Sequence, residues 1–161
     1  MATVAVKHSI TGTMAKGAIA GAAGTWVMGK VTNYLMDLQS EATTQQETQA
    51  MIEGKSAPQL TAEQISKQVG IPVSASQVSY ATGILPAMFY GVLLDRFGRM
   101  GGGRGLLYGT LLFLLMDEIA TPIAGVADKP SAYPWQTHAR GLAGHLALGV
   151  VTYALFKLIN R

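Results

Sequence analysis

The chain has 161 residues, of which 13% are charged, and it contains 19 glycines. A low charged share combined with abundant glycine is atypical of a soluble domain and typical of helices that pack closely in lipid. The absence of cysteine excludes disulfides, thiol catalysis and cysteine-ligated metals, and the scattered basic residues behind the net charge of +3 do not predict a nucleic-acid partner.

Four stretches of the chain are apolar enough to be membrane spans, which need about 20 mostly apolar residues. They cover residues 14–38, 78–94, 105–124 and 141–159, with a polar connection over residues 39–77. The third and fourth are the clearest, whereas the second is short and Lys30 interrupts the first. The pattern predicts an all-α fold, a four-helix transmembrane bundle forming one integral membrane domain over residues 1–161, with the lipid bilayer as its surroundings.

The charged residues that flank these stretches divide unequally between the two ends of such a bundle. One end receives Asp95 and a set of basic residues, namely Lys7, Lys16, Arg96, Arg99, Arg104, Lys157 and Arg161. The other end receives both signs, including the glutamates of the polar connection. Because cytoplasmic loops of membrane proteins carry an excess of Lys and Arg, this distribution predicts that both termini are cytoplasmic.

The polar connection is predicted to form a short helical cap on the non-cytoplasmic side. It is rich in good helix formers, and Pro58 is expected to break the first helix. Thr61 and Gln64 match a capping box, which predicts the start of a second helix. Ser74 or Ser76 is expected to cap the next span.

The apolar stretches show a pattern that could be an internal repeat. Residues 17–31 align with 105–119, and residues 79–93 align with 145–159. The first alignment pairs Gly17 with Gly105 and therefore Lys30 with Glu118. The similarity is either chance resemblance between apolar segments or the trace of two helical hairpins of the same orientation, related by an axis along the membrane normal.

Small residues on these stretches are predicted to form helix–helix contacts, because they let backbones approach closely. The candidates are Gly17, Gly21, Gly24, Gly83, Gly105, Gly109 and Gly149. On the first stretch, the glycine face lies opposite Lys30, Asn33 and Asp37. A helix with a small-residue face and an opposite polar face needs neighbours on both sides, which predicts a homo-oligomer or a membrane-protein partner.

Asp117 and Glu118 are adjacent carboxylates inside an otherwise apolar stretch. Ionisable groups in a span are costly, and they usually face the bundle interior and pair. We therefore expect an ion pair between Lys30 and either Glu118 or Asp117, serving helix register or function. The two carboxylates point about 100° apart on an α-helix, so they cannot serve one partner equally. Thr121 and Pro122 follow, which predicts a kink or a helix end nearby.

The fourth stretch adds two histidines on one helical face. His138 is expected near the surface and His145 within the outer half of the membrane, at the depth of the carboxylates. Such a histidine is either a hydrogen-bonded interior group or one that exchanges protons with a carboxylate. The predicted polar cluster consists of Lys30, Asn33, Asp117, Glu118, His138 and His145. No spaced metal-binding signature is present, so we predict no metal, cofactor or catalytic residue.

Two segments of the chain resemble a known family. "VSYATGILPAMFYGVLLD" and "HARGLAGHLALGVVTYALFKLI" are similar to the YagU-like small bacterial inner-membrane proteins, in which a hydrophilic residue or His enters a Gly-containing span. Ser79 stands where the family pattern has His, and His145 matches it. The resemblance covers the C-terminal half and implies a multi-span protein of the bacterial inner membrane, without an established activity.

Three functions remain open on the sequence alone. The first is a non-enzymatic inner-membrane protein of accessory or assembly type, with a buried polar cluster in the outer half of its bundle. The second is a small proton- or ion-linked transporter or channel that uses the same cluster. The third is an intramembrane metal enzyme built on the histidines and carboxylates.

Overall fold

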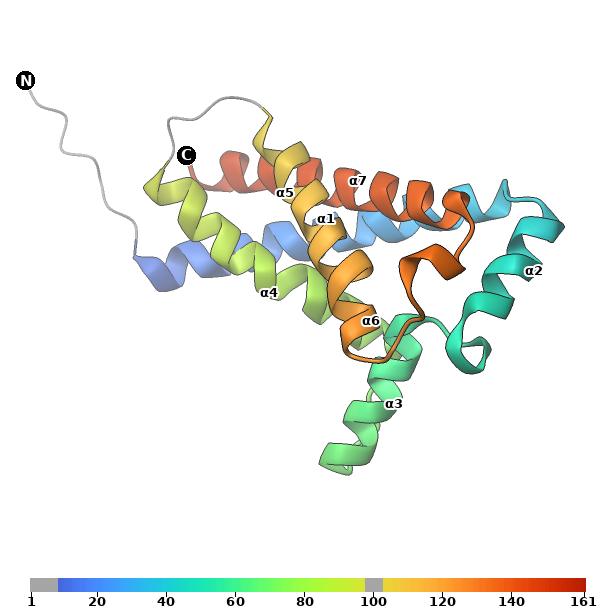
Figure 1. Cartoon of the computed structure of the whole chain (residues 1–161). Helices are drawn as coiled ribbons and strands as arrows, with labels where there is room; N and C mark the ends of the chain where they lie inside the picture. The colour runs from blue at the N-terminus through green and yellow to red at the C-terminus, as the bar shows by residue number, and fades with distance from the viewer. Residues whose placement is uncertain (1–8, 98–102) are drawn as a thin grey trace, which may run out of the picture.

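The computed structural model describes residues 9–97 and 103–161, and all regular secondary structure within these ranges is helical (Figure 1). Lys7 and Arg99, used above in the argument on orientation, lie outside the described residues. The elements are α1 (Ile10–Asp37), α2 (Glu41–Ala50), η1 (Ile52–Gly54), α3 (Ala57–Val69), α4 (Ala75–Arg96), α5 (Arg104–Phe113), η2 (Leu114–Ala120), α6 (Thr121–Ile123), η3 (Pro130–Ala132) and α7 (Trp135–Ile159).

Among the described residues, three helices are long and apolar enough to cross a membrane: α4, α7 and the continuous run of α5, η2 and α6. Their outward faces carry large apolar side chains, such as Phe89 with 64% exposure and Leu107 with 61%. Both observations support an integral membrane protein. The first predicted span differs from these three. Helix α1 is long enough, but it carries Lys16, Lys30 and Asp37, and its mean hydropathy is lower than that of the other three.

The four long helical segments pack in the spatial order α4, α1, α7, α5. Helix α1 packs on α4 and α7, and α5 packs on α7. Figure 1 shows α1 and α7 side by side, with α4 and α5 on the near side of that pair. Since α7 lies between α1 and α5, residues on these two helices are kept apart, which matters for the predicted pairing of Lys30.

All the glycines predicted to form contacts lie where two helices meet. A Cβ on Gly17 would come within 2.6 Å of the Ala87 carbonyl oxygen of α4, and one on Gly105 within 2.8 Å of the Gly149 carbonyl oxygen of α7. A Cβ on Gly109 would collide with the carbonyl of His145. The remaining members make equally close contacts, namely Gly21, Gly24, Gly83 and Gly149. Close backbone approach therefore holds the helices together.

Helices α4 and α5 are the pair that does not close. Tyr90 and Tyr108 stack between them, with ring centroids 4.0 Å apart and planes within 3°. Above and below this contact, an apolar groove of about 760 Å³ runs between the two helices. Its lining includes Phe89, Leu107 and, at one end, Arg104.

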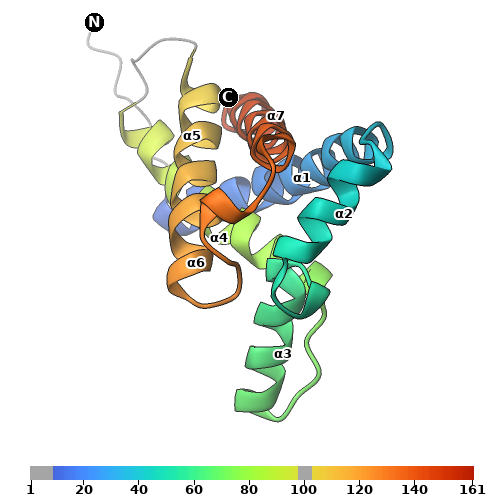
Figure 2. The same ribbon diagram turned by 45° about the vertical axis from the view of Figure 1, so that its right-hand side comes forward.

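The polar connection forms the helical cap, α2, η1 and α3, at the end of the bundle far from the start of α1 and the end of α7 (Figure 2). The predicted capping box is wrong. Ser56 and Gln59 form the box, because Pro58 lies in the first turn of α3, where its missing N–H costs nothing. Thr61 instead donates to the Ala57 carbonyl within the helix. Ser74 caps α4, as expected.

Side-chain bonds join the helix ends at the opposite end of the bundle. The Lys16 ammonium donates to Asn160, and Asn160 donates to Asp95, at 2.9 and 3.0 Å. These contacts connect the start of α1 with the ends of α7 and α4. Lys16 thus lies at the same end of the bundle as the ends of α4 and α7, as the charge distribution predicts.

Candidate functional site

The carboxylates lie on a π-helical segment, η2, between α5 and α6. The N–H of Thr121 donates to the carbonyl five residues earlier, that of Met116. An α-helical register would require a donor from Pro122 to the carbonyl of Glu118, and proline has none. Pro122 therefore leaves the Glu118 carbonyl without an α-helical donor, and π-helical segments are frequent at functional sites.

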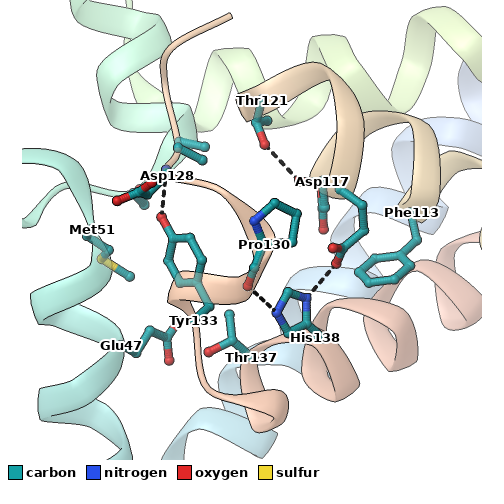
Figure 3. A pocket seen from close by; sticks show the side chains of 14 residues that line it. Glu47, Met51, Phe113, Asp117, Thr121, Asp128, Pro130, Tyr133, Thr137 and His138 are labelled. Carbon is teal, nitrogen blue, oxygen red and sulfur yellow. Dashed lines mark hydrogen bonds and ion pairs between the residues drawn. The ribbon is translucent and has the colours of Figure 1, made fainter. Parts of the chain in front are cut away.

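Glu118 pairs with His138 of α7. The Nδ1 atom of His138 lies 2.6 Å from Oε1 of Glu118, and its Nε2 lies 3.0 Å from the Pro130 carbonyl oxygen (Figure 3). A carbonyl only accepts hydrogen bonds, so Nε2 must carry a proton. The short Nδ1–Oε1 contact then needs a second proton between the two side chains, because two lone pairs would repel each other. Both ring nitrogens of His138 thus lie within hydrogen-bond distance of an oxygen acceptor.

Asp117 approaches the second histidine of α7. Its Oδ2 atom lies 3.5 Å from Nδ1 of His145. The same Nδ1 lies 3.0 Å from the Gly141 carbonyl oxygen, to which it donates. The His145 side chain is 5% exposed and that of Asp117 is 42% exposed. Unlike the Glu118–His138 pair, these contacts need only one ring proton, the one on Nδ1, so a neutral imidazole is sufficient.

Two cavities lie on either side of the Asp117–His145 contact. The first, of about 190 Å³, is lined by Asp117, Glu118 and His138 and extends to Glu47 of the cap. Figure 3 shows His138 facing the helix that carries Asp117, with Pro130 on its other side. The second cavity, of about 200 Å³, is lined by His145 and by side chains from α1 and α4. Asp117 and His145 thus face different cavities.

The structure brings together Asp117, Glu118, His138 and His145 but not the rest of the predicted cluster. The expected Lys30 ion pair is wrong. Lys30 is exposed on α1, with its ammonium 5.6 Å from the centre of the Trp26 ring. Asn33 is exposed as well. Both lie opposite the glycine face of α1, which turns toward α4 and α7, so neither reaches the carboxylates.

Sequence reasoning missed a buried ion pair that attaches the cap. The Arg140 guanidinium of α7 forms a salt bridge with Glu47 of α2, and their side chains are 13% and 5% exposed. Gln39 bonds to both, donating to Glu47 and accepting from Arg140. We call Gln39, Glu47 and Arg140 the cap clamp. Glu47 is followed at helical spacing by Ala50 and Met51, which was the available signal.

The cap clamp lowers the pKa of the Glu47 carboxyl group. Burial alone raises the pKa of its carboxyl group. Hydrogen bonds from Arg140 and Gln39, together with the positive charge of Arg140, outweigh burial and hold this pKa below its ordinary value of 4.5. The group is therefore ionised when the cap is seated.

Among the described residues, no three His, Asp or Glu side chains are arranged to hold a metal ion. Searches against protein-family models, curated proteins and solved structures find no match for this chain. The site is therefore interpreted from its own geometry.

Proposed function

We propose that this protein is a multi-span membrane protein of proton- or ion-linked transporter type. Its working centre is the layer of Asp117, Glu118, His138 and His145 beneath the cap, which we call the His–carboxylate layer. Histidine changes charge near physiological pH, and a neighbouring carboxylate is a suitable proton partner. Ionisable groups at membrane depth are expensive and usually mark ion or proton paths.

The short contact between Glu118 and His138, which a shared proton accounts for, is the observation that carries this proposal. A contact of 2.6 Å joins Nδ1 and Oε1 while Nε2 is committed to a carbonyl. Without that proton, the two side chains could not keep this distance, because their lone pairs would repel each other. Removal of the proton would separate the two side chains at the wall of the first cavity, which provides a simple link between protonation and the shape of the site.

Proton flux into liposomes, followed with an enclosed pH-sensitive dye, tests this function. We expect flux with the wild-type protein and its loss in Glu118→Gln, because the amide cannot take up a proton. Glu41→Gln, an exposed glutamate of α2, is the matched control. Histidine ¹⁵N NMR of the reconstituted protein should show both ring nitrogens of His138 protonated at neutral pH. Flux unaffected by Glu118→Gln, with a neutral His138, would refute the proposal.

We further propose that α1 is the fourth span and that both termini are cytoplasmic in a bacterial inner membrane. The clustering of Lys16, Arg96 and Arg104 at one end supports this orientation, and the YagU-like resemblance supports the membrane. Because the chain has no cysteine, single-cysteine variants report location. A membrane-impermeant maleimide should label Glu41→Cys in cells whose outer membrane has been permeabilised, and Arg161→Cys only after lysis. The reverse pattern would invert the topology.

The hairpin repeat belongs to the same proposal, in a changed register. A Cβ on Gly21 would lie 3.1 Å from the Gly83 carbonyl oxygen, and one on Gly105 would lie 2.8 Å from that of Gly149. These matching contacts support two hairpins in which Gly21, rather than Gly17, corresponds to Gly105. Counting onward, Asn33 corresponds to Asp117 and Ser79 to His145. The first hairpin then carries uncharged counterparts of the site.

An accessory or assembly role is the second candidate, and a surface of α1 favours it. Trp26, Lys30, Asn33 and Asp37 are exposed on one side of this helix. A Cβ on neighbouring Gly29 would meet nothing within 4 Å. Exposed polar groups within a span call for a protein neighbour rather than lipid. We propose that this surface, the α1 polar face, contacts a second copy of the chain.

A further inference from the structure

The polar side chains that line the second cavity come from three helices, α1, α4 and α7. Four hydroxyl groups border it: those of Thr25 and Thr32 from α1 and those of Ser79 and Thr82 from α4. His145 of α7 borders it from the other side. The other side chains that line it are apolar, and none of the lining residues carries a fixed charge.

Every one of these hydroxyl groups has its proton committed elsewhere. Each donates to the carbonyl four residues earlier on its own helix, at distances between 2.8 and 3.1 Å. A hydroxyl has one proton and two lone pairs. Only lone pairs are therefore available to a molecule in the cavity, so the hydroxyl groups act there as acceptors.

His145 adds a further acceptor when neutral. Its Nδ1 donates to the Gly141 carbonyl at 3.0 Å, which leaves the lone pair on Nε2. Nε2 makes no hydrogen bond within the described part of the chain. With His145 neutral, the polar side chains that line the cavity therefore present only acceptors, which suit a cation or a molecule that donates hydrogen bonds.

The charged groups around His145 favour a cation. Asp117 lies 3.5 Å from its Nδ1, and Glu118 with His138 forms the neighbouring pair, in electrostatic contact with Asp117. From α1 and α4, only hydroxyl and apolar groups line the cavity, and Lys30 points away on the exposed side of α1. Thr82 is exposed, so a cation held here keeps part of its hydration.

We propose that the second cavity binds a small ammonium-type cation in exchange for a proton on His145. Ammonium donates hydrogen bonds and accepts none, and imidazole nitrogen suits an N–H donor better than an alkali ion, which prefers oxygen. Protonation of His145 turns Nε2 into a donor and adds a positive charge, so proton and cation compete for one atom. This inference deepens the proposed proton-linked function and rests on it.

Binding of radiolabelled methylammonium to the protein in nanodiscs tests the inference. We expect binding at about pH 8 and an apparent Kd weakened at least about tenfold at about pH 5.5, where histidine is protonated. Thr32→Val and Ser79→Ala, each removing one acceptor on a different helix, should also weaken binding. Thr152→Val, a buried threonine of α7 that does not line the cavity, is the matched control.

Several results would overturn the inference. These are no saturable binding, equal affinity at both pH values, equal competition by NaCl or KCl, or wild-type affinity in both cavity variants. Thr32→Val and Ser79→Ala lie on separate helices, so a folding defect in one variant leaves the other informative. Proton flux that depends on Glu118 without methylammonium binding would remove this inference alone. Methylammonium binding without Glu118-dependent flux would remove the proposed function instead.

Discussion

At the scale of single residues, the cap clamp is a buried ion pair outside the His–carboxylate layer. Breaking a buried pair by removing one partner typically costs about 3–5 kcal/mol, because an unpaired charge is left behind. We expect losses of this size in Glu47→Leu and in Arg140→Met, and recovery of most of the loss in the double variant. Thermal unfolding in detergent measures this coupling. Additive losses would contradict a direct pair.

The lowered pKa of Glu47 gives the clamp a pH dependence. A group whose pKa is lowered by folding contributes stability that is present above its unfolded pKa and is lost as the pH falls through its folded pKa. The difference in Tm between wild type and Glu47→Gln should therefore be full at neutral pH and shrink below the ordinary value of 4.5. Glu41→Gln on the same helix should show no such trend.

The residues of the site could be predicted in part from helical spacing. That spacing placed His138 and His145 on one face and the carboxylates at the same depth. The partner of Glu118 could not be predicted, because an α-helical wheel takes no account of the π-helical turn of η2. Lys30 was misassigned because the aligned repeats ignored α7, which lies between α1 and α5.

At the scale of elements, the packing of α5 on α7 depends on the glycines of both helices. A Cβ on Gly109 would collide with the carbonyl of His145, whereas one on Gly29 would meet nothing within 4 Å. We expect Gly109→Ala to destabilise the protein by about 1–3 kcal/mol through overpacking. Gly29→Ala should be neutral or stabilising by up to about 1 kcal/mol through helix propensity.

Tm values in one detergent, interpreted as free energies of unfolding, compare these two substitutions. Equal effects would mean that close backbone approach does not hold α5 against α7. The positions of the glycines could be read from the sequence because each recurs at helical spacing. The helix each one contacts could not be read, since Gly24 meets α7 while Gly17 and Gly21 meet α4.

At the scale of the whole molecule, the α1 polar face predicts self-association. Because the chain has no cysteine, Asn33→Cys on this face should form a disulfide-linked dimer in oxidised membranes. Leu115→Cys, exposed on η2 and directed away from that face, is the control and should remain monomeric. Only monomer from Asn33→Cys, or equal crosslinking of both variants, would argue against the contact.

The number of long helices and the cap could be predicted from apolar runs and turn residues. The sequence also predicts α1 as a span, and this stays a prediction, because α1 carries Lys30 and Asp37 on its exposed side and does not reach the hydropathy of the other long helices. The proposed orientation rests on charge counts at the loops, and the Lys16–Asn160–Asp95 contacts show only that these helix ends meet at one end of the bundle.

The groove between α4 and α5 has a consequence for how the protein is handled. Protein supplies its walls on the sides of Phe89 and Leu107, and the surrounding medium supplies the remaining one. In a bilayer that wall is made of acyl chains, and in a micelle it is made of detergent tails. The shape of this side of the molecule therefore depends on the medium around it. We expect the free energy of unfolding of the same chain to differ between a bilayer and a micelle.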